Sequence, residues 1–443
     1  MHNDSSFTNE QDERSAAIEE NGREQQGEEL RLPPETLLPA GVSPSLASRR
    51  PAGRKQLTLI AVVVSLLLAA SALLLPILLA QPATLTTTSH PATTASIVGH
   101  VFFTSSGQLN PTSSEGLNDV VHIDLGGLTP PASEKSDYAW LLSDTSHDEQ
   151  QPVFLGVLQI LRGSAQLTYT APTHTNLLAT YSRFLVTEQA ANEEPIVPLL
   201  DPATWRYAGN IPDIPTPGDA NHYSLLSHLR HLLAKDPTLQ GIGLSGGLDI
   251  WLYRNAGKIL EWSSAARDDW AGGQASLALM RRQVERVLDY LDGAVFVGYD
   301  GPRNTPLLVD PKAGRIGLLE FEQGQTPPGY LAHVDFHLVG YTHAPGVTAD
   351  QKRLATGIDA MLTAVTALLW KVHGDATLLA QMSDTALLTP QALSLLDDMY
   401  TDATDAFVGQ PDPATGGVQG GITQIHDELQ LLAIIQVSTV TGS

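Results

Sequence analysis

The sequence contains no cysteine among its 443 residues. Disulfide bonds, thiolate nucleophiles and cysteine-ligated metals are therefore excluded, and any zinc site would have to use His, Asp or Glu. Basic residues are also scarce, because 25 Lys and Arg stand against 48 Asp and Glu and give a formal net charge of −23. This negative charge argues against nucleic acid as a partner. The length allows two or three domains, each with an ample core.

Charge is absent altogether from residues 57–80, LTLIAVVVSLLLAASALLLPILLA. A helix of about 20 residues already crosses the hydrocarbon core of a bilayer, so this run predicts a transmembrane helix. Four basic residues lie at positions 49–55, and the next one after the run is Lys135. The positive-inside rule therefore places residues 1–56 in the cytoplasm and the rest outside. A signal-anchor fits better than a cleaved signal peptide, because the preceding segment is too long for one, but cleavage near Ala80 stays open as an alternative.

The segments on either side of this run are polar. Residues 1–48 hold ten acidic residues and three basic ones, which indicates a disordered acidic tail, followed by the basic flank that completes residues 1–56. Residues 81–97 are rich in Thr, Ser, Pro and Ala, which is typical of a stalk.

Residues 98–198 alternate short apolar runs with turn residues, as in VGHVFF, DYAWLLS and VFLGVLQI. Several short strands at this spacing predict an antiparallel β-sandwich. Residues 199–221 contain four prolines and are expected to form a linker.

The same β-region resembles the extracytoplasmic β-domain of anti-sigma-K factors. The matching features are the turn Leu128-Thr129-Pro130-Pro131, the strand Tyr138–Leu141, the pair Leu155-Gly156 and a strand ending at Glu188. The resemblance implies a sandwich in a membrane-regulatory setting of a bacterial cell. It does not extend to sigma-factor binding, because residues 1–48 are too short and too acidic for the helical domain that performs it in that family.

From residue 222 onward the apolar residues recur at helical spacing, which predicts a mainly α-helical bundle over residues 222–443. The predicted apolar faces begin at Leu225, Leu277 and Leu354, and Thr389-Pro390 is expected to open a further helix. Residues 422–435 are assigned to the last helix. AVFVGYDG and the following PLLVDPKAGRIGLLEFE, within residues 294–322, are expected to form a small β-hairpin insertion.

Residues 333–343, HVDFHLVGYTH, match the spacing of a three-histidine zinc signature. A helix beginning near Tyr330 would place His333 and His337 one turn apart, and Gly340 would end it so that His343 could return. Val334 replaces the glutamate that activates the zinc-bound water in metalloproteases, so any zinc at His333, His337 and His343 would not be catalytic in that way. Alternatively these residues form an ordinary helix end, since the chain has 14 histidines.

Residues 240–251, QGIGLSGGLDIW, match two patterns at once. One is a dinucleotide-binding fingerprint, and the other is the nucleophile elbow Gly243-x-Ser245-x-Gly247, with Asp310 and a histidine following in the order that hydrolases use. Both patterns need a preceding buried strand, and the preceding AKDPTLQ is polar. A flexible turn between helices is the favoured interpretation, with Gly246-Gly247 supplying positive φ angles.

These observations predict an α+β multidomain protein, with a membrane-anchored β-sandwich followed by an α-helical bundle. The favoured function is a non-enzymatic extracytoplasmic binding or regulatory domain, whose partners are the membrane and a protein bound by the tail or the outer domain. Two alternatives stay open: an extracytoplasmic hydrolase or zinc-binding protein that uses Ser245 or the three histidines, and a structural or adhesive envelope protein. No cofactor is expected, and zinc is left open as the one candidate.

Overall fold

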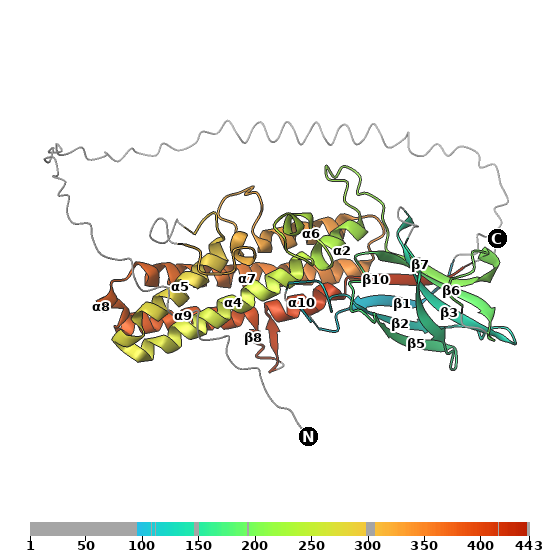
Figure 1. Cartoon of the computed structure of the whole chain (residues 1–443), viewed down its shortest axis with the longest axis horizontal. Helices are drawn as coiled ribbons and strands as arrows, with labels where there is room; N and C mark the ends of the chain where they lie inside the picture. Colours follow the sequence, from blue (N-terminus) through green and yellow to red (C-terminus); the bar gives the residue numbers. More distant parts are fainter. Residues whose placement is uncertain are drawn as a thin grey trace, which may run out of the picture. The chain divides into compact units, whose positions relative to one another are not determined.

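The computed structural model describes residues 95–440, apart from residues 108, 111, 146–149, 193–194, 298–305 and 415. The acidic tail, the predicted transmembrane helix at residues 57–80 and all but the end of the stalk lie outside the described residues. Within them, the strands of one large sheet gather at one end and the helices at the other (Figure 1).

Eight strands form one antiparallel sheet in the order β4-β3-β6-β7-β10-β1-β2-β5. Their bounds are β1 Ile97–Thr104, β2 Val120–Gly126, β3 Lys135–Ser143, β4 Val153–Leu158, β5 Ser164–Thr170, β6 Tyr181–Ala190, β7 Trp205–Asn210 and β10 Ile434–Thr439. The edge strands β4 and β5 follow one another in the chain and lie in contact. The sheet is therefore a nearly closed barrel.

The α+β class and the antiparallel β-structure are confirmed, but the expected sandwich of two sheets is wrong. The first six strands form two groups in the sheet order, β4-β3-β6 and β1-β2-β5. Two strands from outside residues 98–198, β7 and β10, join the groups into one sheet. β7 lies within the predicted linker, and β10 contains Ile435, which had been assigned to the last helix. The alternating burial of residues 434–437 fits a strand.

The helical region confirms the predicted apolar faces. Its longer helices are α2 Leu225–Leu233, α4 Leu248–Asp269, α5 Leu277–Asp292, α6 Tyr330–His343, α7 Ala349–Gln381, α9 Pro390–Phe407 and α10 Ile422–Gln430. Thr389 is the N-cap residue of α9 and Pro390 occupies its first turn, as expected. Short helices connect these elements: α3 Pro237–Gly241 joins α2 to α4, and α8 Asp384–Leu387 joins α7 to α9.

Helix α7 is the one helix of the described part that is long and apolar enough to cross a membrane by length and composition. Its apolar face packs against α5, α6 and α9, with Ile358, Val365 and Val372 fully buried. The apolar length of α7 is therefore accounted for by the core of the helical region.

A small hairpin is present in the helical region, but not where it was expected. Strands β8 Gly409–Pro411 and β9 Val418–Gly420 pair between α9 and α10. The described residues of 294–322 instead form turns and the short 3₁₀ helix η4 Ala313–Arg315.

Polar contacts join the barrel to α2, in addition to a hydrophobic core that both share. The guanidinium of Arg230 donates to both carboxylate oxygens of Asp144, just after β3, at 2.6 and 2.8 Å. The side-chain amide of Asn118 donates to the carbonyl of Leu233 at 2.8 Å. These contacts fix the orientation of α2, which carries half of the site described next.

Candidate metal centre

Helix α6 supplies two histidines from one face. It begins after Gly329, and the four-residue spacing places His333 and His337 one turn apart, with ring centroids 5.1 Å apart. Both side chains are buried, with exposed fractions of 9% and 1%. The two rings therefore share one face of the helix, as predicted, and that face is buried.

Helix α2 and the turn after it supply the opposing groups. Ser224 caps the start of α2 by accepting from the N–H of Ser227, and His231 lies in its last turn. The chain then reverses at Asp236, which caps the start of α3. One oxygen of Asp236, Oδ1, accepts from the N–H of Leu239 at 3.1 Å, which leaves Oδ2 directed at the histidines.

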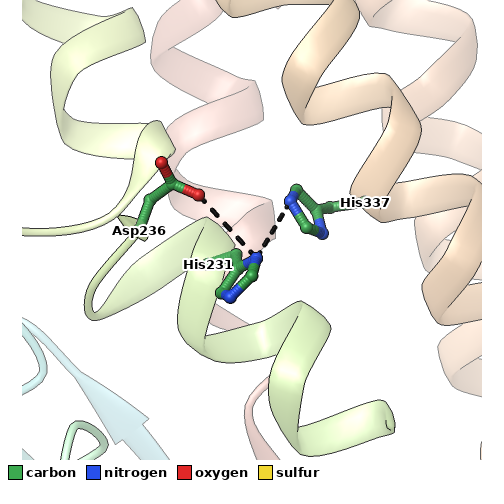
Figure 2. A group of neighbouring side chains, drawn as sticks. All are labelled: His231, Asp236 and His337. Atoms are coloured by element: carbon green, nitrogen blue, oxygen red, sulfur yellow. Dashed lines mark hydrogen bonds and ion pairs between the residues drawn. The ribbon is translucent and has the colours of Figure 1, made fainter. Parts of the chain in front are cut away.

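Three potential ligand atoms converge between these elements, and Figure 2 shows His231 between Asp236 and His337. His231 Nδ1 lies 3.1 Å from His337 Nε2 and 3.7 Å from Asp236 Oδ2. All three atoms lie within 4.8 Å of one another. A fourth atom, His333 Nε2, lies 3.8 Å from Asp236 Oδ2. The group therefore presents two imidazoles and a carboxylate to one small volume, with a third imidazole beside the carboxylate.

A fourth histidine lies behind the cluster. His228 Nδ1 is 3.0 Å from His337 Nδ1, so the ring nitrogen of His337 that faces away from His231 is also hydrogen-bonded. The His228 ring lies against Gly340, where a Cβ atom would be 2.1 Å from His228 Cε1. Partners of this kind, which hold the second nitrogen of a histidine, commonly orient metal-binding imidazoles.

Burial keeps all four imidazoles uncharged at neutral pH. It lowers the pKa of His337 to about 2, with the three neighbouring histidines adding to the effect, and lowers the pKa of His228 to about 4. It also lowers the pKa of His231 and of His333, although the Asp236 carboxylate opposes this. Neutral imidazoles with available lone pairs, next to a buried carboxylate, are a suitable donor set for a divalent cation.

The cluster also forms a consistent hydrogen-bond chain by itself. If His231 Nδ1 and His337 Nδ1 carry the protons, His231 donates to His337 and His337 donates to His228. Metal binding would require the other tautomer of His231, with its proton on Nε2. The hydrogen-bond chain and the metal site use the same residues. They can be distinguished by measuring whether the protein contains metal.

His343, the third histidine of the sequence motif, does not join this cluster. Helix α6 continues through Gly340 to His343, so Gly340 is not the expected terminator. The His343 side chain is exposed and its Nδ1 lies 2.8 Å from the carbonyl oxygen of Val339. Gly340 serves a different purpose, which is to make room for His228.

One side of the cluster borders solvent. The ring of Tyr223 packs edge-on against His231, with centroids 4.9 Å apart. A pocket of about 250 Å³ reaches His231 between Tyr223, Lys235 and Gln240. This pocket is a path by which a hydrated ion could reach the buried atoms.

The glycine-rich segment has no hydrolase context in the structure. The short helix α3, rather than a strand, precedes Ser245, and α4 begins at Leu248. Gly243 and Gly246 have φ angles of 78° and 97°, which confirms a turn that needs glycine, whereas Gly247 has φ −90°. Asp310 accepts from the N–H groups of Lys312 and Ala313 in the turn that leads into η4.

Three residues of the cluster were missed from the sequence: His228, His231 and Asp236. A local signal was present, because His228 and His231 are three residues apart at the border of the apolar face of α2. What the sequence could not show is that α2 packs against α6. No protein-family model, curated protein or solved structure matches this chain.

Proposed function

We propose that the protein binds one divalent transition-metal ion, of which zinc fits best, between α2 and α6. The observation that supports this is the convergence of His231 Nδ1, His337 Nε2 and Asp236 Oδ2 in a buried volume. His333, whose Nε2 lies 3.8 Å from Asp236 Oδ2, would be the fourth ligand. His228 would hold the outer nitrogen of His337.

The two distances from His231 to its neighbouring ligand atoms are close to those of a tetrahedral site. Zinc binds imidazole nitrogen and carboxylate oxygen at about 2.0–2.2 Å, which places neighbouring ligand atoms about 3.3–3.6 Å apart in a tetrahedron. The distances of 3.1 and 3.7 Å around His231 lie on either side of that value. Calcium and magnesium prefer oxygen ligands, and the imidazole-rich set disfavours both.

The proposed ion would be structural rather than catalytic. Four protein ligands leave no open position for a water, and the carboxylate nearest the site, Asp236, is itself a ligand. Val334 occupies the place of a general base. The ion would tie the end of α2 to the middle of α6, and α2 is the helix that contacts the barrel through Arg230.

For the whole chain we propose a non-enzymatic binding or regulatory protein, anchored by residues 57–80 with the described part outside the cell. Support for this setting comes from the uncharged run, its basic flank and the resemblance of residues 98–198 to the β-domain of anti-sigma-K factors. A regulator requires a cytoplasmic partner for residues 1–56, whereas an envelope structural or adhesive protein requires a surface polymer or a second outer domain. Co-purification with the tail distinguishes these roles.

The metal centre is tested by the zinc content of the purified full-length chain. We expect about one zinc per chain after dialysis against zinc-free buffer, measured by inductively coupled plasma mass spectrometry. His337→Ala should lose it, and the matched control His343→Ala should keep it. If neither the wild type nor the control contains zinc, even after incubation with zinc, the proposed metal centre is wrong. The histidines would then serve only in the hydrogen-bond chain.

A further inference from the structure

Apolar side chains gather at the end of the barrel that points away from the helices. At this end β1 and β7 begin, β6 ends, and a turn joins β4 to β5. In the described part of residues 95–210, seven large apolar side chains are exposed, and Leu109 alone lies elsewhere. The other six, named the apolar rim, are Ile97, Leu161, Ile196, Val197, Leu199 and Leu200.

The loop that contributes most of the rim is held in place. Pro195, Pro198 and Pro202 restrict its backbone, and the carbonyl of Leu199 accepts from the indole N–H of Trp205 at 2.9 Å. Ile196 and Leu200 are nevertheless 90% and 85% exposed. The structure therefore directs these side chains outward.

The neighbouring turn behaves in the same way. The backbone groups of Leu161 and Ser164 exchange hydrogen bonds at 2.8 and 3.0 Å, and the Leu161 side chain is 76% exposed. Arg162 follows directly and is also exposed. Clustered exposed apolar residues of this kind mark interaction surfaces, because each would gain about 1.5–3 kcal/mol on burial.

The position of the rim indicates what covers it. The opposite end of the barrel is occupied by helices, through contacts such as that between Asp144 and Arg230. The rim is instead the end at which the chain enters the barrel, at Ile97. Only residues 81–96 separate β1 from the predicted transmembrane helix, and sixteen residues span at most roughly 55 Å. The rim is thus the end of the barrel to which the predicted anchor is joined.

We infer that the apolar rim rests on the bilayer in which residues 57–80 are inserted. Leu161, Ile196 and Leu200 enter the boundary between headgroups and acyl chains, and Arg162 lies at the level of the phosphates. This surface is independent of the proposed metal centre, which lies on α2 and α6. It orients the barrel on the membrane and directs the helical region away from it.

The absence of cysteine permits a direct test in the full-length chain. Single Leu161→Cys and Leu200→Cys variants, labelled with an environment-sensitive fluorophore, are reconstituted in phosphatidylcholine vesicles. The control is Val418→Cys, on the hairpin of the helical region, whose side chain is 56% exposed. We expect both rim probes to show blue-shifted emission, quenching by spin-labelled lipid and protection from iodide, and the control to show none of these.

Three results would overturn the inference. Rim probes quenched by iodide as strongly as the Val418 probe would place the rim in water. A second copy of the chain would cover the rim if spin-labelled lipid did not quench the probes and their protection from iodide increased with protein density in the vesicles. Extraction of the chain from the vesicles at alkaline pH would show that residues 57–80 are not inserted in the bilayer, and the inference depends on that insertion. The zinc content is unaffected by any of these outcomes.

Discussion

The imidazole ring of His228 occupies the space that a side chain at Gly340 would need, since a Cβ atom there would lie 2.1 Å from Cε1 and 2.4 Å from Nε2 of the ring. The relationship joins α2 to α6 behind the proposed metal centre. It also explains why a glycine stands three residues before the end of α6, although glycine within a helix costs stability.

Gly340→Ala should therefore disturb the metal centre from behind. Displacing His228 removes the hydrogen bond to His337 Nδ1, and we expect zinc affinity to fall by roughly 10- to 100-fold. Overpacking should also lower the free energy of unfolding by about 1–3 kcal/mol. The matched control is Gly357→Ala in α7, where a Cβ atom meets nothing within 4 Å and the change should stabilise by about 0.5–1 kcal/mol. Zinc titration and thermal unfolding measure both effects, and unchanged affinity in Gly340→Ala would show that His228 does not support the ligands.

Asp236→Asn should separate the structural role of this residue from its metal ligation. The amide oxygen of asparagine can still accept from the N–H of Leu239 and cap α3, while the amide nitrogen cannot bind a cation. We expect the unfolding temperature without metal to change little. Zinc at about 100 times its dissociation constant should stabilise the wild type by about 2.7 kcal/mol, and the same concentration should not stabilise the variant. An equal response to zinc would remove Asp236 from the ligand set.

Asp289 should make folding stability depend on pH. Burial, with the nearby Asp292 and Glu285 carboxylates adding to it, raises the pKa of Asp289 to about 6, although the N–H of Leu308 opposes the shift. The folded state therefore holds the proton more tightly than the unfolded chain, and this stabilisation is present below about pH 4 and lost as pH rises through 6.

Asp289→Asn imitates the protonated group and keeps an acceptor for Leu308. It should stabilise the protein at pH 7.5 by on the order of 1–2 kcal/mol, allowing for solvent screening, and by much less at pH 4.5. Urea unfolding at the two pH values measures this. A variant that loses stability equally at both pH values would contradict the prediction.

Arg230→Met should weaken the contact between barrel and helices. It leaves Asp144, whose side chain is 8% exposed, without its bidentate partner, and breaking such a buried pair costs about 3–5 kcal/mol. The control is Arg353→Met, which removes an ion pair with Asp350 between side chains that are 76% and 83% exposed, and should cost about 1 kcal/mol or less. Equal unfolding temperatures for the two variants would show that Asp144 finds another partner.

The features that could be predicted from sequence were the local ones. The spacing of His333 and His337 placed both rings on one face, because a helix determines that relationship within a single turn. Their partners His231 and Asp236 come from about a hundred residues earlier, and no local pattern shows that α2 packs on α6. His343 was misassigned because Gly340 was interpreted by its backbone freedom, whereas its missing side chain is what matters.

The same limit applies to the barrel. Strands within residues 98–198 were recognised by alternation, a local property. The closure of the sheet depends on β7 and β10, which lie in a proline-rich segment and after the last helix, and neither position indicates a partner in the sheet. The transmembrane helix at residues 57–80 stays a prediction.

Strand β10 also determines the order in which this protein can mature. It pairs with β1 on one side and β7 on the other, and the backbone N–H of Ser96 donates to the side chain of Thr439, 343 residues later. During synthesis β1 and β7 therefore emerge with open edges, which invite pairing with other chains, and these edges stay open until the whole helical region has followed. A chain that ends before residue 434 lacks β10 and cannot complete the barrel. The barrel strands made earliest then stay unpaired at one edge, and this exposed edge marks the incomplete product for degradation.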